Sequence, residues 1–383
     1  MENKTGVLLV NLGTPDSPAP RDVYRYLIEF LSDKRVIDMP WLSRQLLVRG
    51  VIVPKRYRQS AKAYQKIWMP EGSPLKVYGH RVKEKLQTHL GEGYVVDFAM
   101  RYRSPSIEET LNSLIQKQVN KIIVIPLFPQ YASATTGSVH EKIMDIVSQW
   151  INIPELVLVN NYSTHPALIR AFCAVSKSYD LNNYDHILLS FHGLPEEQLI
   201  KADCAKGCLK TKDCCARLSS NNQHCYAAQC HATARTLAEA LNLGIDQYSV
   251  SFQSRLGRKP WLKPYTNEVI RSLARQGKKK ILVFCPAFVC DCLETIYEIG
   301  IEYAEEFKHA GGERLDLVPG LNDHTQWINA LATMVHHPLN SQHFDSPKHF
   351  RSCAVTNGLA ISQYEPICDG APPGLCGVKT ERI

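Results

Sequence analysis

The sequence predicts an α/β protein built from two similar halves, each a doubly wound, mostly parallel, Rossmann-like sheet. Three observations support this fold class. Short apolar runs of strand length alternate with segments of helical period. The strand runs occur in the same order in both halves, which indicates an internal duplication. Each half also ends with a similar short sequence, at residues 160–165 and 320–325, before an amphipathic helix. The carboxyl edges of the two sheets are expected to face a shared cleft.

The elements follow in order along the chain. Expected strands of the first half are 6–15, 94–103, 121–126 and 156–159, and those of the second are 185–195, 248–256, 280–286 and 315–318. Between them lie helical segments such as 106–116 and 232–241, whose apolar residues recur every three or four positions. The halves are assigned to residues 1–163 and 164–337.

A segment in the first half, residues 26–54, has a different character. Many apolar residues are interleaved there with Arg35, Arg44, Arg49 and the adjoining Lys55, which predicts a hairpin of helices with basic edges. This hairpin is either part of the core or an apolar lip that holds an apolar ligand or rests on a membrane surface.

Two further segments depart from the alternating pattern. Residues 203–230 contain six of the thirteen cysteines in a stretch rich in Lys, Asn and Gly, which indicates an inserted loop. Disulfides rarely persist in the cytoplasm, so a dense group of cysteines there favours metal binding. Residues 338–383 have no periodicity and are expected to form an irregular tail.

Composition and charge place the chain among ordinary globular proteins. It has 383 residues, of which 44% are hydrophobic and 21% charged. It has no apolar run of about 18 residues and no signal-peptide pattern, so a cytoplasmic protein is expected. The formal charge of +7 suits anionic small molecules or acidic lipid headgroups. No motif that reads a nucleic-acid groove is present, so no nucleic-acid partner is expected.

A histidine and a row of glutamates lie at predicted strand ends. His192 ends a short apolar strand that Gly193 stops, and Glu294 begins a helical stretch after another strand, followed by Glu298 and Glu302. Ligands of open α/β sheets bind at this edge. Imidazole and carboxylates bind divalent cations. A structural histidine and a solvated acidic face are the alternatives, but their shared edge favours a metal-handling site.

Several separated motifs together carry a resemblance to a known family. In chain order they are Val10 to Pro15, Glu29 to Asp33, Gly72 to Leu75, Met100 to Tyr102, Pro129 to Tyr131, Thr135 to Ser138, Ser190 to Pro195, Pro260 to Leu262, and Asp291 to Thr295. Through them the sequence, over roughly residues 6–335, resembles the ferrochelatases, lyases that insert ferrous iron into a porphyrin at the end of haem synthesis.

The resemblance implies a fold, a reaction and a set of site residues. The fold would be the two-domain chelatase fold with an active-site cleft between the domains, and the reaction would convert ferrous iron and protoporphyrin IX to protohaem. His192 and Glu294 would form the iron and proton-transfer site, and Glu298 and Glu302 a path for iron or protons. The residues that match the family's macrocycle pocket are Leu12, Arg101, Tyr131, Trp261 and Phe288.

Cysteines raise two further expectations. Some relatives carry a His where this chain has Cys292, which is therefore either a softer neighbour of the metal or a packing residue. Some ferrochelatases carry a two-iron two-sulfur cluster, and four thiolates satisfy such a cluster. The favoured ligands are Cys208, Cys215, Cys225 and Cys230. A zinc site or free redox-active thiols remain the alternatives for this insertion.

Two other functions compete with a protoporphyrin ferrochelatase. One is a ferrochelatase that uses coproporphyrin, and the other is a haem- or metal-binding sensor that kept the fold without turnover. Retention of His192, Glu294 and the acidic row favours an enzyme. The expected partners are a porphyrin and ferrous iron, with peripheral contact to the inner membrane through residues 26–54.

Overall fold

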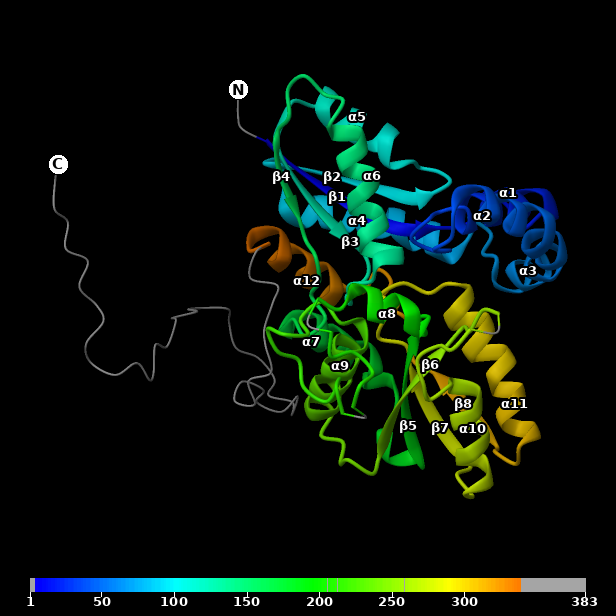
Figure 1. Cartoon of the computed structure of the whole chain (residues 1–383). Coiled ribbons are helices and arrows are strands. Elements are labelled where there is room, and N and C mark those ends of the chain that lie inside the picture. The colour runs from blue at the N-terminus through cyan, green and yellow to red at the C-terminus, as the bar shows by residue number, and fades with distance from the viewer. Residues whose placement is uncertain (1–3, 205, 212, 258, 339–383) are drawn as a thin grey trace, which may run out of the picture. The chain divides into compact units, whose positions relative to one another are not determined.

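Two four-stranded sheets with only parallel strands form the framework (Figure 1). The computed structural model describes residues 4–338 apart from residues 205, 212 and 258. The first sheet has the order β2-β1-β3-β4 and the second the order β6-β5-β7-β8. The strands are β1 (Lys4–Gly13), β2 (Tyr94–Tyr102), β3 (Val119–Pro126), β4 (Glu155–Leu158), β5 (His186–His192), β6 (Tyr248–Gln253), β7 (Lys280–Phe284) and β8 (Arg314–Leu317). The identical order confirms the expected duplication and fold class.

The inner strands are apolar because helices cover both faces of each sheet. Val7 to Val10 of β1 have no exposed surface, and Leu188 and Leu189 of β5 are equally buried. Such continuous apolar runs are typical of parallel strands. In the first half, one face packs on α5 and α6 and the other on α4. In the second half, α10 and α11 cover one face and α9 the other.

The helices agree closely with the expected periods. The helices that cover the sheets are α4 (Pro74–Leu90), α5 (Ile107–Gln116), α6 (Ser138–Val147), α7 (Pro166–Val175), α9 (Tyr226–Ala240), α10 (Thr266–Arg275), α11 (Ala304–His309) and α12 (Thr325–His336). A capping box of Ser106 and Glu109 begins α5, and the hydroxyl of Ser73 caps α4.

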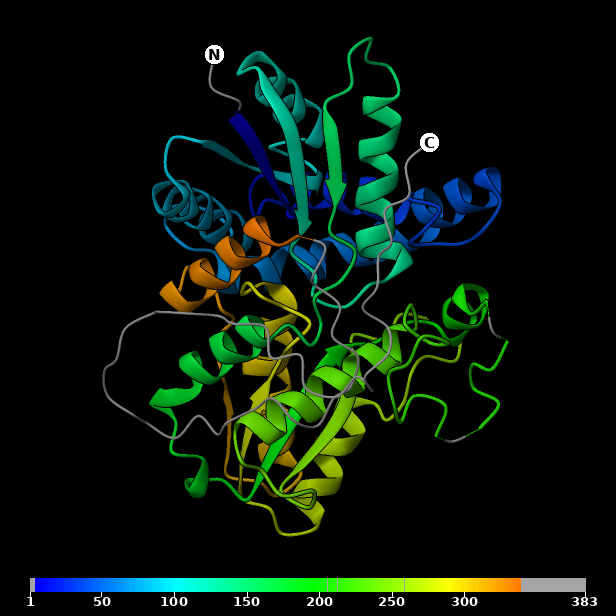
Figure 2. The same cartoon turned by 90° about the vertical axis from the view of Figure 1, so that its left-hand side faces the viewer.

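One hydrophobic core continues from the first sheet to the second. It includes Phe98 and Ile123 from the first sheet, and Phe191 and Leu282 from the second. Helix α12 lies between the two sheets in both Figure 1 and Figure 2. The residues described all belong to one compact unit, so the halves are held together by this core.

Residues 20–67 form a separate group of helices, here called the lip. It consists of α1 (Pro20–Leu31), α2 (Trp41–Leu47), a π-helical turn (Val48–Ile52) and α3 (Val53–Ile67). The lip projects beside the first sheet in Figure 1. Its large exposed apolar residues are 37% to 68% exposed, and they are Met39, Trp41, Leu42, Leu46 and Val51. No helix in the described part of the chain is long and apolar enough to cross a membrane.

The sequence singles out three further regions, which are the acidic row, the insertion and the tail. The acidic row lies on a π-helix, η5 (Leu293–Tyr303), because the backbone there widens to i→i+5 hydrogen bonds. The insertion leaves the short helix α8 (Glu196–Ala202) and consists of turns up to Cys225, as far as it is described. The expected tail 338–383 lies outside the described residues after residue 338.

Candidate active site

His192 lies at the carboxyl end of β5, the second strand of its sheet. Its Nδ1 lies 2.6 Å from the carbonyl oxygen of Gly193. A carbonyl oxygen only accepts hydrogen bonds, so Nδ1 carries the proton in the neutral ring and Nε2 keeps a lone pair. The hydroxyl of Tyr226 donates to the His192 carbonyl oxygen at 2.8 Å and fixes the backbone there. The imidazole is therefore oriented with one nitrogen available as a base or metal ligand.

Two expected pocket residues flank this imidazole. The ring centroids of Trp261 and Phe288 lie 6.4 and 6.2 Å from that of His192. Trp261 comes from the loop after β6, and Phe288 from the loop after β7. The structure thus brings three expected site residues together, although they are separated by up to 96 positions in the chain.

Glu298 is a largely buried carboxylate on which the charge of His192 acts. Its Oε1 accepts hydrogen bonds from the Ser254 backbone N–H and the Tyr303 hydroxyl, both at 2.9 Å. Its Oε2 accepts from the Ser254 hydroxyl and, at 3.4 Å, from Gln253 Nε2. Burial raises the pKa of Glu298, and the charge of Glu294 adds to this, while the hydrogen bonds and His192 oppose it. A carboxyl with a raised pKa is a stronger base than an ordinary glutamate, which suits it to accept a proton.

Gln253 connects the elements of this edge. Its Oε1 accepts from the Ser190 hydroxyl at 2.7 Å, and its Nε2 donates to the Glu294 carbonyl oxygen at 2.8 Å. Because Gln253 is 2% exposed, these bonds hold the first turn of η5 against β5 and β6. The sequence analysis missed this residue, since an internal Gln at a strand end carries no pattern of its own.

Glu294 lies at the other side of the same turn. Its carboxylate is within hydrogen-bonding reach of the Cys292 thiol. Its negative charge also adds to the raised pKa of the buried Tyr26 and Tyr64 of the lip. Burial, together with the nearby Glu294 carboxylate, raises the pKa of Cys292. A protonated thiol at this place is a packing and hydrogen-bonding group, which is the second of the two interpretations considered for Cys292.

A cavity of about 500 Å³ extends along the acidic row. Glu294, Glu298 and Glu302 line one wall, and Arg56 and Gln59 of α3 line the other. Burial raises the pKa of Glu302, and the neighbouring Glu298 raises it further. Glu302 is exposed, whereas Glu298 is held beneath it, so the row leads from solvent toward His192.

The first half contributes residues around Leu12 and Arg101. Leu12 packs against the buried apolar cluster of the lip, and Leu293 of η5 packs against the same cluster. Arg101 donates to Asp33 at 2.8 Å and to the Ser138 hydroxyl at 2.7 Å. Burial opposes ionisation of Asp33, but hydrogen bonds from Ser138, the Arg35 backbone and Tyr102, with the charge of Arg101, lower its pKa overall. Arg101 is thus anchored by a buried ion pair that the sequence analysis did not foresee.

Tyr131, the remaining expected pocket residue, lies against the second half. Its backbone N–H donates to Gln229 Oε1 at 2.6 Å, and its ring lies 6.3 Å from that of His224. Gln229 belongs to α9, so Tyr131 lies where the insertion meets the core.

The insertion brings four thiols close together. Cys214 and Cys215 have their Sγ atoms 3.5 Å apart, those of Cys215 and Cys225 are 4.0 Å apart, and Cys208 is within hydrogen-bonding reach of Cys225. Cys225 is the residue just before α9, and a hydrogen bond from Cys215, together with nearby backbone N–H groups of that helix, lowers the pKa of its thiol to about 6. Cys230, in contrast, is fully buried within α9, where burial raises its pKa.

The donor atoms of these four thiols suit an iron-sulfur cluster, but their arrangement in this structure does not. Thiolates are the ligands that such clusters use, and Cys225 is readily ionised. Yet no three His, Cys, Asp or Glu side chains of the described chain converge in a way that could hold a metal ion. A cluster would therefore require the turns of the insertion to move the other thiols around Cys225.

Comparison with known proteins gives a family and a fold. The ferrochelatase family matches residues 4–339. A ferrochelatase of Coxiella burnetii (strain Dugway 5J108-111) is 46% identical over 334 residues, which are 87% of this chain and 93% of the relative. A ferrochelatase of Legionella pneumophila (strain Lens) is 44% identical over 332 residues, which are 87% of this chain and 98% of the relative.

A solved structure supports the architecture. SirB from Bacillus subtilis with Fe3+ aligns with 87% of this chain and 95% of its own, with a TM-score of 0.50 and 14% sequence identity. At this identity the likeness shows the fold alone. It confirms the chelatase fold that the sequence led us to expect.

Proposed function

This chain belongs to the ferrochelatase family, the lyases of the terminal step of haem synthesis, and we propose that it inserts ferrous iron at the sheet edge that carries His192, Glu294 and Glu298. One observation carries the choice of site. The imidazole at the end of β5 has a free Nε2 and lies within electrostatic reach of a buried carboxyl whose pKa is raised. That pairing can take up protons and bind a divalent cation.

The reaction exchanges two protons for one metal ion. A free-base porphyrin carries two inward N–H protons, and ferrous iron replaces both, so two protons leave for each haem formed. His192 Nε2 accepts a proton from a pyrrole nitrogen, and Glu298 and Glu302 pass protons outward to solvent. The raised pKa values of the two glutamates suit this task, because each holds a proton to higher pH than an ordinary glutamate does.

Ferrous iron is the second substrate, and the acidic row gives it a route. It enters at the exposed Glu302, passes Glu298 and reaches His192 and Glu294. Carboxylate and imidazole ligands suit this borderline ion. Arg56, on the opposite wall of the cavity, limits the net negative charge of the route and so disfavours tight retention of the ion.

The porphyrin lies between the lip and the loops that carry Trp261 and Phe288. Leu12, Arg101 and Tyr131 complete the pocket on the first half. Burial of the macrocycle against these aromatic and aliphatic side chains supplies binding energy, at about 25 cal/mol per Å², that can be used to bend the ring. Arg101 is already paired with Asp33, so it shapes the wall and its charge is not free for a propionate. We assign protoporphyrin IX as the substrate and protohaem as the product.

The lip brings the protein to the inner membrane from the cytoplasmic side. Trp41, Leu42 and Leu46 are each more than 60% exposed on one short helix, which is costly unless another surface covers them. An apolar porphyrin and its haem product also partition into membranes, so contact there shortens the path of the substrate.

The insertion binds a two-iron two-sulfur cluster in this proposal. The contacts among thiols favour Cys208, Cys214, Cys215 and Cys225 as its ligands, with Cys214 in place of the expected Cys230. Cys214→Ser should then remove the visible colour and the acid-labile sulfide of protein purified without oxygen, and Cys230→Ser should not. Zinc without sulfide would reject the cluster and leave the reaction at His192 untouched.

An anaerobic optical assay tests the proposed reaction. Purified protein is mixed with ferrous iron and either protoporphyrin IX or coproporphyrin, and the conversion of the free-base spectrum to that of the haem is followed. We expect turnover with protoporphyrin at the higher kcat/KM. Faster turnover with coproporphyrin would reassign the substrate. Porphyrin binding without any insertion would favour the non-catalytic sensor.

A further inference from the structure

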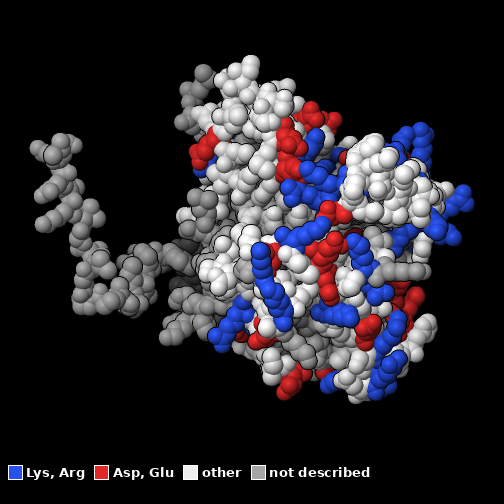
Figure 3. Space-filling view, in the orientation of Figure 1, with Lys and Arg blue, Asp and Glu red and all other residues white. Residues whose placement is uncertain are grey.

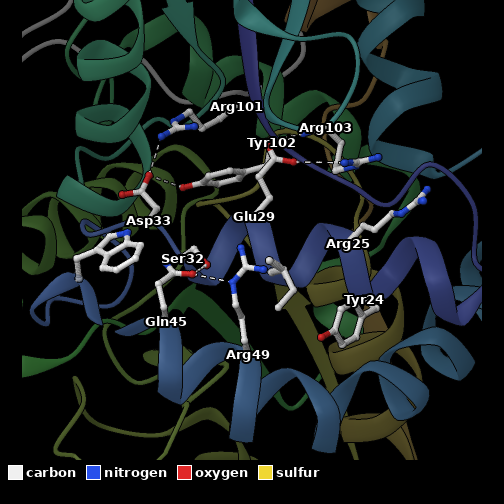
Figure 4. Close-up of a pocket in the computed structure, with 12 residues that line it drawn as sticks. Tyr24, Arg25, Glu29, Ser32, Asp33, Gln45, Arg49, Arg101, Tyr102 and Arg103 are labelled. Atoms are coloured by element: carbon white, nitrogen blue, oxygen red, sulfur yellow. Dashed lines mark hydrogen bonds and ion pairs between the residues drawn. The ribbon is translucent and has the colours of Figure 1, made fainter. Parts of the chain in front are cut away.

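A groove on the lip is lined, apart from Arg101 and its partner Asp33, by residues that the proposed reaction does not use. It has a volume of about 700 Å³ and lies between α1, α2 and residues 101–103 at the end of β2. In Figure 4 the pair of Asp33 and Arg101 lies at one end, Arg25 and Arg103 lie at the other, and Arg49 rises between them from the π-helical turn that follows α2. Four arginines thus surround one open cavity.

The carboxylates of the groove do not neutralise all four arginines. Asp33 pairs with Arg101 at 2.8 Å, and Glu29 lies 3.6 Å from Arg103, which also pairs with Asp16 outside the groove. Arg25 has a partly exposed partner in Asp22 at 3.6 Å. Arg49 donates to the neutral amide oxygen of Gln45 at 2.8 Å, and no carboxylate of the described chain pairs with it. The groove therefore retains positive charge, mainly at Arg25 and Arg49.

On α1, the residues that line the groove and those that pack toward the proposed porphyrin pocket lie on different faces of the helix. Tyr26 and Phe30 pack toward Leu12 and the π-helix η5. Arg25, Ile28, Glu29 and Ser32 of the same helix line the groove instead. At 100° per residue the centres of these two sets lie about 130° apart around the helix. A propionate of a porphyrin beside His192 is thus an unfavourable candidate for this groove.

The surroundings of the groove are apolar and basic. Trp41 lines the groove and is 68% exposed, and the exposed Leu42 and Leu46 lie on the same helix. Residues 20–62 contain ten Lys and Arg but four Asp and Glu, an excess of six, against seven for the whole chain. Figure 3 shows an uncharged protrusion in this region with Lys and Arg around it. Nearly all of the net charge is therefore concentrated on the lip.

We propose that this groove binds the phosphate group of an anionic glycerophospholipid while Trp41, Leu42 and Leu46 enter the edge of the bilayer. The inference rests on the membrane contact proposed above and adds to it a defined site. Guanidinium groups suit phosphate because they form paired, charge-assisted hydrogen bonds with its oxygens. An apolar helix face next to basic residues is the pattern of helices that lie in the membrane interface.

A pair of matched double variants separates a defined site from diffuse attraction. Arg25→Gln/Arg49→Gln removes two charges from the groove, and Lys55→Gln/Arg58→Gln removes two charges from exposed positions of α3 outside it. The probe is a short-chain phosphatidylglycerol kept below its micelle concentration, titrated by calorimetry. We expect the groove variant to lose about 30-fold in affinity, at about fivefold per charge, and the α3 variant to retain wild-type affinity.

Three outcomes would overturn the inference. Equal losses of lipid affinity in both variants would mean diffuse attraction. Inorganic phosphate that binds as tightly as the lipid would mean a site for free phosphate. A raised KM for porphyrin in the groove variant would mean a site for a propionate. Sedimentation with phosphatidylglycerol vesicles separates this inference from the proposed membrane contact. If the wild type ignores vesicles, the contact itself is wrong. If the wild type binds vesicles and the groove variant binds them as well as the α3 variant does, only the proposed phosphate site in the groove is wrong.

Discussion

Glu298→Gln tests the link between burial and proton transfer at the π-helix. The variant keeps the shape of the side chain and removes its charge. Its amide oxygen can still accept from the Ser254 N–H and the Tyr303 hydroxyl, but its NH2 group faces Gln253 Nε2, another donor. One hydrogen bond to a charged group, at about 1.5–3 kcal/mol, is lost. Relief from burying a charge offsets this cost, so we expect the unfolding free energy to change by less than about 2 kcal/mol.

Catalysis should respond far more strongly than stability. Removal of a positioned acid or base typically costs about 100- to 10,000-fold, and we expect kcat for iron insertion to fall within that range. Glu305→Gln, an exposed carboxylate beyond the π-helix, is the control and should keep the wild-type rate. Anaerobic optical assays give the rates, and urea unfolding gives the stabilities.

The same variant makes a prediction about pH. Because the folded-state pKa of Glu298 lies above its ordinary value of 4.5, the folded protein holds this proton to higher pH than the unfolded chain does. The stability of the wild type therefore falls as pH rises from 4.5 through the folded-state pKa, and the variant lacks this part of the decline. A near-wild-type rate in Glu298→Gln, or a stability difference that does not change with pH, would refute the reasoning.

Three other changes give further tests. Asp33→Asn breaks the buried pair with Arg101 and should destabilise the protein by about 3–5 kcal/mol at neutral pH. Urea unfolding should find this difference reduced as pH falls below 3.8, because the wild type then loses the same contribution. Trp261→Ala should raise the KM for porphyrin about tenfold and leave the KM for iron unchanged in steady-state assays. In cluster-free protein one thiol should react with iodoacetamide with a midpoint near pH 6, and Cys225→Ser should abolish this reaction. Survival of the reaction in the variant would contradict the assignment of the low pKa to Cys225.

The sequence predicted the sheets and the edge of the site because both depend on local patterns. Apolar runs stopped by Gly193 or Pro286 mark strands and their ends, and the repeat of these runs implies a second sheet of the same order. His192 could be found because it ends such a run, and Glu294 because it begins a helical stretch after another one.

The partners of these residues could not be predicted, because distant segments supply them. Glu298 owes its raised pKa to burial among Gln253, Ser254 and Tyr303, and its importance appears only when β6 and η5 are placed together. The π-helix itself has no sequence period that separates it from an α-helix over eleven residues. In the insertion, spacing favoured Cys230, but the path of the turns brings Cys214 to Cys215 and leaves Cys230 inside α9.

Proton release during a single anaerobic turnover tests the central claim most directly. Stoichiometric protein, porphyrin and ferrous iron are mixed in a weakly buffered indicator solution, and haem formation and proton release are recorded together. The account predicts two protons per haem in the wild type and in His309→Ala, an exposed control. It predicts neither haem nor protons in His192→Ala, although that variant still binds porphyrin. Haem formation with proton release at the wild-type rate in His192→Ala would contradict the account.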